Sequence, residues 1–375
     1  MSTTRRTAPL RVLHVDSGQE WQSVRDQVRL LVDGLAVEPR VEQAVATLTA
    51  SRLEAECEEL GVPVIPLPLT AGGDPRALQV LARYARSAWD VYHAHDGTAL
   101  EMLLYIQALD GSNTPLVATR RFGVGPSVPR RWRRASVVLA TSRSARDGLV
   151  RAGVEPNRIA VVPHGIDAEA PVAEEPGTLR TAIGASPTHR LVASFTALSR
   201  HRDHTTLLRA ARRLVDRHDE ARFAVLGRGP ERPKIEDLVE RYGLEGRVCL
   251  PGYLPDARRY MCDLDVFVMP AFHEELTSAC LEAMVAGVPV VMPSAAASKG
   301  TDGAPGPVRV PPGDAEAMAD AIEELLRDEH RHREAARRGR AFARRHGAAS
   351  LVARTLRAYR RVVEPRRARR PVPRA

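Results

Sequence analysis

The sequence predicts an α/β protein of two domains, each a parallel sheet covered on both faces by helices. Its 375 residues exceed the length over which a single hydrophobic core usually forms. In both halves, short segments rich in β-branched residues alternate with segments of helical periodicity, which is typical of parallel sheets. Ligands of such domains bind at the carboxyl ends of the strands, so we expect a binding cleft between the two.

In the N-terminal half, the apolar run Leu10–Val15 predicts the first strand. A loop over Asp16–Gln22 and an amphipathic helix ending at Gly34 follow it. Short runs bounded by turn formers predict six more strands, at Val41–Thr49, Val62–Pro66, Asp90–Ala94, Leu116–Thr119, Ser136–Thr141 and Ile159–Val162. Helical periodicity predicts helices between them, at Arg52–Leu60, Pro75–Ser87, Ala99–Leu109 and Ser144–Ala152.

The second half repeats this alternation after a segment rich in Ala, Glu, Pro and Gly, Ala168–His189, which we interpret as a connector. Strands are expected at Leu191–Thr196, Arg222–Leu226, Val248–Leu250, Val266–Met269 and Val288–Val291. Helices are expected at Thr205–His218, Arg232–Tyr242, Thr277–Ala286, Asp314–Arg327, Arg331–Arg345 and Ala349–Val363. The expected domains are therefore 1–167 and 190–345, with a final helix and basic tail over 346–375.

The net charge of +9 is unevenly distributed along the chain. Residues 327–375 contain 17 Arg and 4 acidic residues, a net +13, so the rest of the chain is mildly acidic at −4. A second basic cluster, Arg120–Arg134, includes Phe122 and Trp132. Because the body is acidic and no recognition motif is visible, we expect no nucleic-acid partner. An anionic membrane surface suits the Arg-rich segments better, and a solvated charged face is the alternative.

Composition and motif searches exclude several other classes. No apolar run reaches the length of a membrane-spanning helix, no signal peptide precedes the first strand, and the four cysteines are scattered, so we expect a cytoplasmic protein. The pair Asp263 and Asp265 resembles a metal-binding DxD but directly precedes a strand, and we expect it to be structural. The loop Gly227-Arg-Gly229 lacks the remaining features of a dinucleotide fingerprint.

The most informative pattern pairs two carboxylates around a helix start. Glu274 lies in the loop after an apolar strand, and Glu282 lies two turns inside the helix that begins near Thr277. Backbone N–H groups from Leu276 to Ser278 are unpaired at such a terminus and suit a phosphate or sugar oxygen. The alternative is that Glu274 caps the helix and Glu282 is a surface charge.

This segment resembles the E-x7-E motif of the family 4 retaining glycosyltransferases of the GT-B fold, and the likeness extends over about residues 10–330. It is most specific in the second half and looser in the first. Further matching segments are Phe223–Pro230, Gly243–Tyr253, Gly287–Val291, Val310–Asp314, Asp90–His95, Ala140–Ser142 and Ile159–Asp167. The resemblance implies two Rossmann-like domains facing a cleft, with the C-terminal helix crossing back to the N-terminal domain. It also implies transfer of a sugar from a nucleotide diphosphate sugar to an acceptor hydroxyl, with retention and without metal or cofactor.

The resemblance also assigns roles in the C-terminal half. Glu282 would hold the ribose hydroxyls and Glu274 the transferred sugar, while Leu276, Thr277 and Ser278 would face the donor. Glu275 stands where relatives carry glycine. The glycine-containing loop of Gly227 and Gly229 would lie beside the donor.

The diphosphate needs cations as its negative charge develops. Arg202 takes the place of a family lysine, a substitution made credible by a chain that has only two lysines. Thr196 stands where an arginine is usual, and Arg200 is the candidate substitute.

In the N-terminal half, the resemblance places a histidine beside the donor sugar, and His95 and His93 are the candidates. They lie two residues apart at a strand end and therefore point to one face. The alternative is a purely structural role, in which loop carbonyls accept hydrogen bonds from both rings. Gly18 belongs to the loop where relatives often carry a glycine pair, which is replaced here by Ser23 and Val24.

Two alternatives stay open at this point. One is a catalytically altered GT-B-like protein that binds an anionic membrane surface or another partner. The other is a nucleotide-sugar epimerase on the same scaffold. The base, the sugar and the glycan, lipid or small-molecule acceptor are left open by the sequence, as is a location at the inner face of the membrane.

Overall fold

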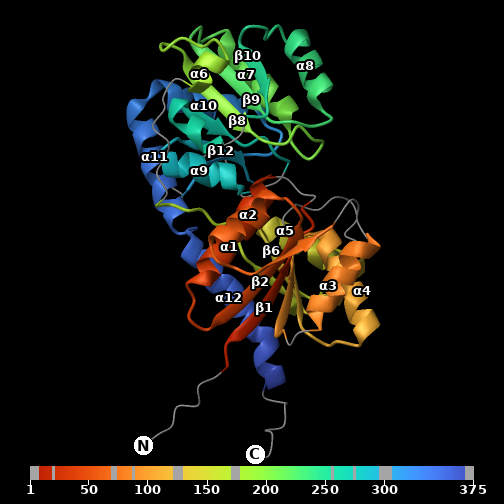
Figure 1. Ribbon diagram of the computed structural model, residues 1–375. Coiled ribbons are helices and arrows are strands. Elements are labelled where there is room, and N and C mark those ends of the chain that lie inside the picture. Colours follow the sequence, from red (N-terminus) through yellow and green to blue (C-terminus); the bar gives the residue numbers. More distant parts are fainter. Residues whose placement is uncertain are drawn as a thin grey trace, which may run out of the picture. The chain divides into compact units, whose positions relative to one another are not determined.

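The computed structural model describes residues 8–18, 22–68, 74–86, 89–120, 130–169, 178–254, 257–272, 276–294 and 306–367 (Figure 1). The chain divides into two compact units. The N-terminal domain comprises Met1–Gly165 together with Ala348–Ala375, and the C-terminal domain comprises Ile166–Gly347.

The N-terminal domain contains a parallel sheet in the order β3-β2-β1-β4-β5-β6-β7. Its strands are β1 (Leu10–Val15), β2 (Val41–Leu48), β3 (Val64–Leu67), β4 (Val91–Ala94), β5 (Leu116–Arg120), β6 (Val137–Ala140) and β7 (Ile159–Val161). Its helices are α1 (Gln22–Ala36), α2 (Arg52–Glu59), α3 (Pro75–Ala85), α4 (Gly97–Asp110), α5 (Arg143–Arg151) and α12 (Ala348–Arg367). Apolar residues of α1, α2 and α12 pack on one face of the sheet, and those of α3, α4 and α5 pack on the other.

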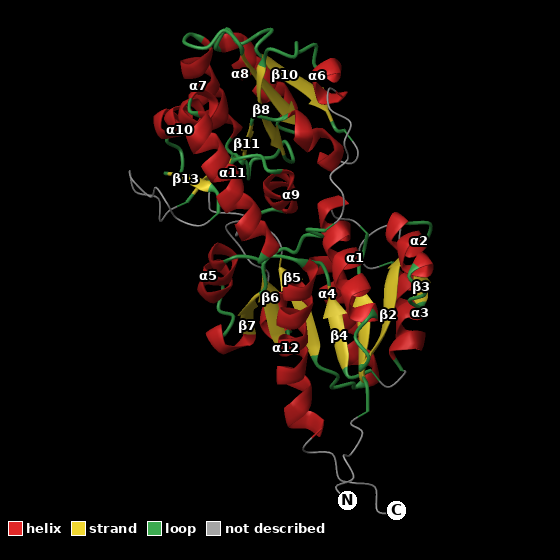
Figure 2. Cartoon of the chain, turned by 90° about the vertical axis from the view of Figure 1, so that its left-hand side faces the viewer, coloured by secondary structure: helices red, strands yellow, loops and turns green. Residues whose placement is uncertain are grey.

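The C-terminal domain repeats this plan with the sheet order β10-β9-β8-β11-β12-β13. Its strands are β8 (Arg190–Phe195), β9 (Ala221–Leu226), β10 (Val248–Gly252), β11 (Val266–Val268), β12 (Val290–Pro293) and β13 (Val308–Val310). Its helices are α6 (Thr178–Ala182), α7 (His204–Val215), α8 (Arg232–Arg241), α9 (Ser278–Ala286), α10 (Ala315–Arg327) and α11 (Glu329–Arg344). Figure 2 shows helices on both sides of the strands in each domain, as the sequence predicts.

The C-terminal helix packs on the N-terminal domain, as the resemblance implied. Helix α12 contacts α1, and its side chains Leu351, Leu356 and Tyr359 share a core with Val12 of β1. In Figure 1 this helix, drawn in blue, lies beside the red and orange elements that begin the chain. The arginine-rich final segment is thus mainly two ordered helices, with α11 in one domain and α12 in the other.

Among the differences from the sequence-based expectations, two concern a strand and a helix of the C-terminal domain. Strand β13 was not expected, because three residues between proline-rich segments are too few to show an apolar periodicity. The expected connector contains α6, whose Leu179 is fully buried and whose backbone N–H groups donate to Asp263. From Thr178 onward, this segment is therefore part of the C-terminal domain.

None of the helices over the described residues combines the length and the apolar character needed to cross a membrane.

Candidate functional site

Both sheets have a point at which the strand order reverses, between β1 and β4 in the N-terminal domain and between β8 and β11 in the C-terminal domain. Ligands of open α/β sheets bind outside the carboxyl ends of the strands at such a point. Many of the residues singled out in the sequence lie near these two places, so each place is described in turn.

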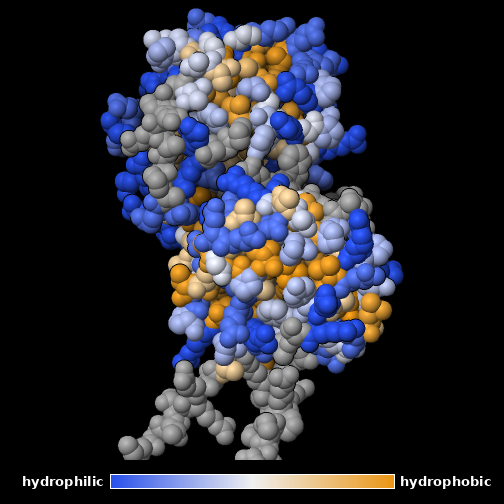
Figure 3. Space-filling view, viewed as in Figure 1, coloured by the Kyte–Doolittle hydropathy of each residue, from blue (hydrophilic) through white to orange (hydrophobic). Residues whose placement is uncertain are grey.

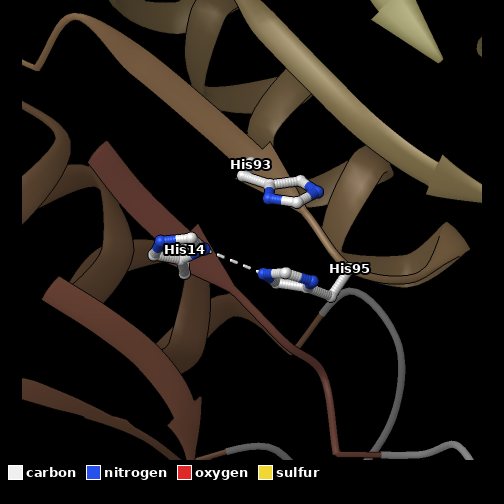
Figure 4. Close-up of side chains that lie close together, drawn as sticks. All are labelled: His14, His93 and His95. Atoms are coloured by element: carbon white, nitrogen blue, oxygen red, sulfur yellow. Dashed lines mark hydrogen bonds between the residues drawn. The ribbon is translucent and has the colours of Figure 1, made fainter. Parts of the chain in front are cut away.

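In the N-terminal domain, three buried imidazoles meet where β1 and β4 end, and we call His14, His93 and His95 the histidine cluster (Figure 4). His14 is aligned with His93 across the parallel pair, and the rings of His93 and His95 lie 4.0 Å apart between centroids. The expectation that His93 and His95 point to one face is thus confirmed.

Hydrogen bonds within this cluster connect different parts of the fold. The Nδ1 atom of His14 lies 2.9 Å from Nε2 of His95. His93 places Nδ1 2.6 Å from the hydroxyl of Tyr359 on α12 and Nε2 2.7 Å from Oγ1 of Thr119 on β5. Side-chain hydroxyls therefore lie within hydrogen-bond distance of both ring nitrogens of His93.

His14 is held in its neutral form. Burial lowers the pKa of His14 to about 3, because an imidazolium would lose its hydration there, and the side chain of Gln43 opposes this only in part. A neutral imidazole offers one donor and one acceptor nitrogen, so it can bind a hydroxyl group without contributing charge.

The loop after β1 is fixed against the first turn of α4. The carboxylate of Asp96 caps α4 by accepting from the N–H of Ala99, and it also accepts from the N–H of Ser17 at 2.7 Å. Gly18 has φ +68°, and its N–H donates to Asp16. Beside the cluster is a cavity of about 20 Å³, enough for about one water. Its polar lining includes His93, His95, Thr119, Gln27, Thr141, His164 and Thr355.

The three imidazoles also form the group of possible metal ligands over the described residues, with donor atoms all within 4.8 Å of one another. A metal ion there would have to replace the bond between His14 and His95 and at least one of the two hydroxyl bonds of His93. The present geometry is thus that of a hydrogen-bonded network.

In the C-terminal domain, two glycines bring the loop after β9 against the end of β8. A Cβ atom on Gly227 would lie 1.8 Å from the carbonyl oxygen of Thr196, and one on Gly229 would lie 2.1 Å from that of Leu198. Their φ angles are +145° and +157°. This close approach requires glycine, and it places backbone at the carboxyl edge where β8, β9 and β11 end.

Arg202 follows β8 and reaches toward β11, with its guanidinium 3.8 Å from the sulfur of Met269 just beyond that strand. It therefore crosses the point where the strand order reverses. The side chain of Arg200, the proposed substitute for the missing arginine, is 89% exposed and pairs with Glu231. Thr196 hydrogen-bonds His204 at the start of α7, and burial lowers the pKa of His204 to about 4.

The start of α9 confirms the helix boundary expected from the sequence. Thr277 caps the helix by accepting from the N–H of Cys280, while Leu276 is partly buried before it. Ser278 is buried at the first helical position, and Glu282 is half-buried in the second turn. Glu274 and Glu275 lie outside the described residues.

The DxD pair lies at the opposite end of the sheet, before β11 begins. Asp263 accepts from the N–H groups of Leu179 and Arg180, and Asp265 pairs with Arg180 and Arg190. These two carboxylates fasten α6 and β8 together, as expected of a structural pair.

Sequence reasoning missed His14 and Tyr359. The available signal for His14 was a polar side chain inside a buried run, on the same face of the strand as Val12. Tyr359 carried no local signal, because its partner His93 is 266 residues away in the sequence.

Comparisons with known proteins agree with this architecture. Residues 19–170 match a family model described as Glycosyltransferase Family 4, and residues 189–328 match one described as Glycosyl transferases group 1. Among solved structures, HepE of Anabaena in complex with UDP and glucose has a TM-score of 0.75 at 19% identity, covering 93% of this chain and 98% of that one. Sucrose-phosphate synthase of Thermosynechococcus elongatus has a TM-score of 0.71 at 18% identity, covering 95% and 100%. At these identities, the two structures show the fold.

Curated relatives match over shorter stretches. The chain is 43% identical over 114 residues to the 2-deoxystreptamine N-acetyl-D-glucosaminyltransferase of Streptomyces fradiae, covering 30% of this chain and 27% of that protein. It is 34% identical over 169 residues to the 2-deoxystreptamine glucosyltransferase of Streptomyces kanamyceticus, covering 43% of each. The chain therefore spans less than half the length of these relatives. With two family models that together match most of the chain and with the fold of its structural neighbours, this protein belongs to the group 1, family 4 glycosyltransferases of the GT-B fold.

Proposed function

We propose that the protein transfers a sugar from a nucleotide diphosphate sugar to an acceptor hydroxyl. The observation that supports this most is the grouping in the C-terminal domain of Arg202, the glycine loop and the N-terminus of α9 around the end of β11. A guanidinium and unpaired helix N–H groups attract a diphosphate, and they stabilise the negative charge that develops as it leaves.

In this proposal the transfer proceeds with retention. It needs no metal, because Arg202 and the backbone supply the positive charge at the diphosphate. The proposed roles are that Glu282 binds the ribose, that Glu274 and Glu275 bind the transferred sugar, and that His95 accepts a hydrogen bond from a sugar hydroxyl. The leaving phosphate takes the proton of the acceptor on the same face of the sugar.

The relatives suggest which substrates to test first. HepE was solved with UDP and glucose, and the two Streptomyces relatives are named as transferring glucosyl and N-acetylglucosaminyl groups to 2-deoxystreptamine. We therefore propose a UDP-linked hexose as donor and an aminocyclitol as the first acceptor to try. Lipid-linked or polysaccharide acceptors come second, since a lipopolysaccharide core glycosyltransferase of Rhizobium meliloti is also similar.

The test compares the wild type with Glu282→Gln and with the matched surface control Glu240→Gln. We expect UDP to raise the melting temperature of the wild type and of Glu240→Gln, and to have a much smaller effect on Glu282→Gln. Product formation from UDP-glucose or UDP-N-acetylglucosamine, with an α-anomeric NMR signal and no loss of rate in a chelator, would support transfer, retention and metal independence in turn. A wild type that responds to no nucleotide contradicts the proposal, and interconversion of the donor sugars would identify an epimerase.

We also propose that the protein docks on an anionic membrane surface from the cytoplasm. Arg354, Arg357, Arg360 and Arg361 are all exposed along α12, with Glu364 as the acidic residue among them. Figure 3 shows the edge formed by α11 as hydrophilic too. In that helix, however, Arg333 and Arg338 form ion pairs with glutamates one turn earlier, so their charge is partly neutralised.

Sedimentation with vesicles tests this second proposal. We expect binding to vesicles that contain phosphatidylglycerol, no binding to neutral phosphatidylcholine vesicles, and loss of binding in an Arg354→Gln, Arg357→Gln, Arg361→Gln triple variant. Equal binding by that variant would assign the contact to other arginines.

A further inference from the structure

The side chain of Gln43 lies beside the histidine cluster in a fixed orientation. Strand β2 pairs with β1 so that Gln43 is aligned with Val12, which places its side chain on the face that also carries His14. Its amide nitrogen donates to the carbonyl oxygen of Val32 on α1 at 2.7 Å. Because a carbonyl can only accept, the amide oxygen of Gln43 must be the atom on the other side.

Two buried polar atoms are left to satisfy at this place. Both Oε1 of Gln43 and Nε2 of His14 are buried, and neither has a hydrogen-bond partner within the described part of the chain, so each can satisfy the other. The side chain of Gln43 raises the pKa of His14, against the larger effect of burial, as an acceptor that faces the ring does. An amide oxygen cannot donate, so pairing these two atoms requires the proton of neutral His14 to be on Nε2.

The position of this proton determines the next one. With Nε2 protonated, Nδ1 of neutral His14 has only a lone pair, and it lies 2.9 Å from Nε2 of His95. The bond between the two rings then needs the proton of His95 on Nε2, where it is donated to His14. Nδ1 of His95 consequently becomes the accepting nitrogen of that ring.

We propose that Gln43 and His14 are positioning residues that hold His95 in its Nε2-protonated tautomer, through the series of bonds from His95 to His14, from His14 to Gln43 and from Gln43 to the carbonyl of Val32. The inference rests on the proposed function for its catalytic meaning, because His95 is there the group that accepts a hydrogen bond from a sugar hydroxyl. A fixed acceptor nitrogen selects ligands that present a hydroxyl donor, and it disfavours ligands that present only an acceptor there.

The tautomer can be measured without any substrate. In protein with ¹⁵N-labelled histidine, two-bond ¹⁵N–¹H spectra distinguish the two neutral tautomers, and His→Gln variants at single positions assign the signals of His95 and His14. We expect both rings in the wild type to be protonated on Nε2. Gln43→Met removes the acceptor at nearly constant shape, and we expect a mixture of tautomers for both rings.

Two further variants make the test specific. In Gln43→Glu a neutral side chain can still donate to Val32 and accept from His14, so we expect the wild-type spectrum to return. Gln107→Met removes a hydrogen bond of the same kind in the same domain, which the side-chain amide of Gln107 donates to the carbonyl of Thr114. We expect this variant to leave the tautomers of both rings unchanged. Circular dichroism confirms that each variant is folded.

Kinetics then connect the tautomer to catalysis. We expect kcat to fall about tenfold in Gln43→Met, the equivalent of one net hydrogen bond, to recover in Gln43→Glu and to stay constant in Gln107→Met. Protonation of His95 on Nδ1 in the wild type, or a spectrum unaffected by Gln43→Met, overturns the proposed series of hydrogen bonds. If the wild type transfers no sugar from any donor, the proposed function fails. The spectra still test the proposed series of hydrogen bonds independently.

Discussion

The N-terminal and C-terminal domains reverse their strand order in the same way, between the first strand and the fourth, and they differ in what fills that point. The N-terminal domain places three buried imidazoles there, and burial holds His14 neutral. The C-terminal domain places Arg202, two glycines and a helix start there. The same topology therefore carries a buried hydrogen-bonded network in one domain and, in the proposed function, a site for the donor diphosphate in the other.

The difference follows from solvation. The guanidinium of Arg202 belongs to a side chain that stays protonated in proteins, whereas burial of the His14 ring beside β2 and β4 removes the hydration of an imidazolium and so lowers its pKa. We infer that substrate charge is handled in the C-terminal domain and hydroxyl recognition in the N-terminal domain. The following predictions test that division, from the largest expected effect to the smallest.

Arg202→Met tests the anion site. We expect kcat for sugar transfer to fall by roughly 10²- to 10³-fold, because the departing diphosphate loses a positioned cation. Arg212→Met, which alters an exposed arginine of the same domain paired with Asp216, should change kcat little, and Arg200→Met should also have a small effect because its side chain is mostly exposed. Equal losses of kcat in Arg202→Met and Arg200→Met would show that both arginines stabilise the negative charge of the diphosphate.

Gly227→Ala tests the close approach that shapes the same site. A Cβ atom would overlap the carbonyl of Thr196, so the loop must move, at a cost of about 1–3 kcal/mol in backbone strain. We expect a lower melting temperature by circular dichroism and weaker UDP binding. Gly246→Ala is the matched control, since Gly246 has φ +73° with nothing within 4 Å, and it isolates the cost of the dihedral angle alone.

The pH dependence of unfolding tests the neutral site. The pKa of His14 is about 3 in the folded protein and 6.5 when unperturbed, so between these values the unfolded state binds more protons. The free energy of unfolding should therefore fall as the pH drops from 6.5 toward 3. All three tryptophans, Trp21, Trp89 and Trp132, belong to the N-terminal domain, so their fluorescence in urea titrations follows that domain.

His14→Gln should flatten this dependence in the fluorescence signal. His204→Gln, which removes a second histidine of lowered pKa but in the C-terminal domain, should leave the fluorescence slope unchanged. A His14→Gln protein with the wild-type slope would mean that other groups of the N-terminal domain bind the protons.

Tyr359→Phe tests the contact between α12 and the histidine cluster. Removing the hydroxyl leaves Nδ1 of His93 without this partner, and we expect a loss of about 1 kcal/mol in fluorescence-detected stability. Tyr105→Phe is the control, because Tyr105 is 51% exposed on α4. A loss of the same size in both variants would show that the bond contributes nothing specific.

Much of the fold and part of the site could be read from the chain. Hydrophobic periodicity predicted both sheets and a helix that starts near Thr277, and the structure shows that Thr277 caps it. Gly227 and Gly229 were also singled out, because their segment resembles the glycine-containing loop of the family, and the structure shows that a Cβ atom at either position would overlap backbone. Strand β13 and helix α6 were missed because segments of three and five residues hold less than two full periods.

What the sequence by itself determined is therefore local: the order of strands and helices, their caps, the glycine turns and the position of the arginines. Only the tertiary structure decided which polar side chains are buried together. His14, His93 and Tyr359 come from three distant segments. The bond of His14 to His95 and that of His93 to Tyr359 exist because β1 lies next to β4 and α12 packs over both. Burial then forces buried polar groups to satisfy one another, since water can no longer do so, and the same burial keeps His14 and Tyr359 neutral.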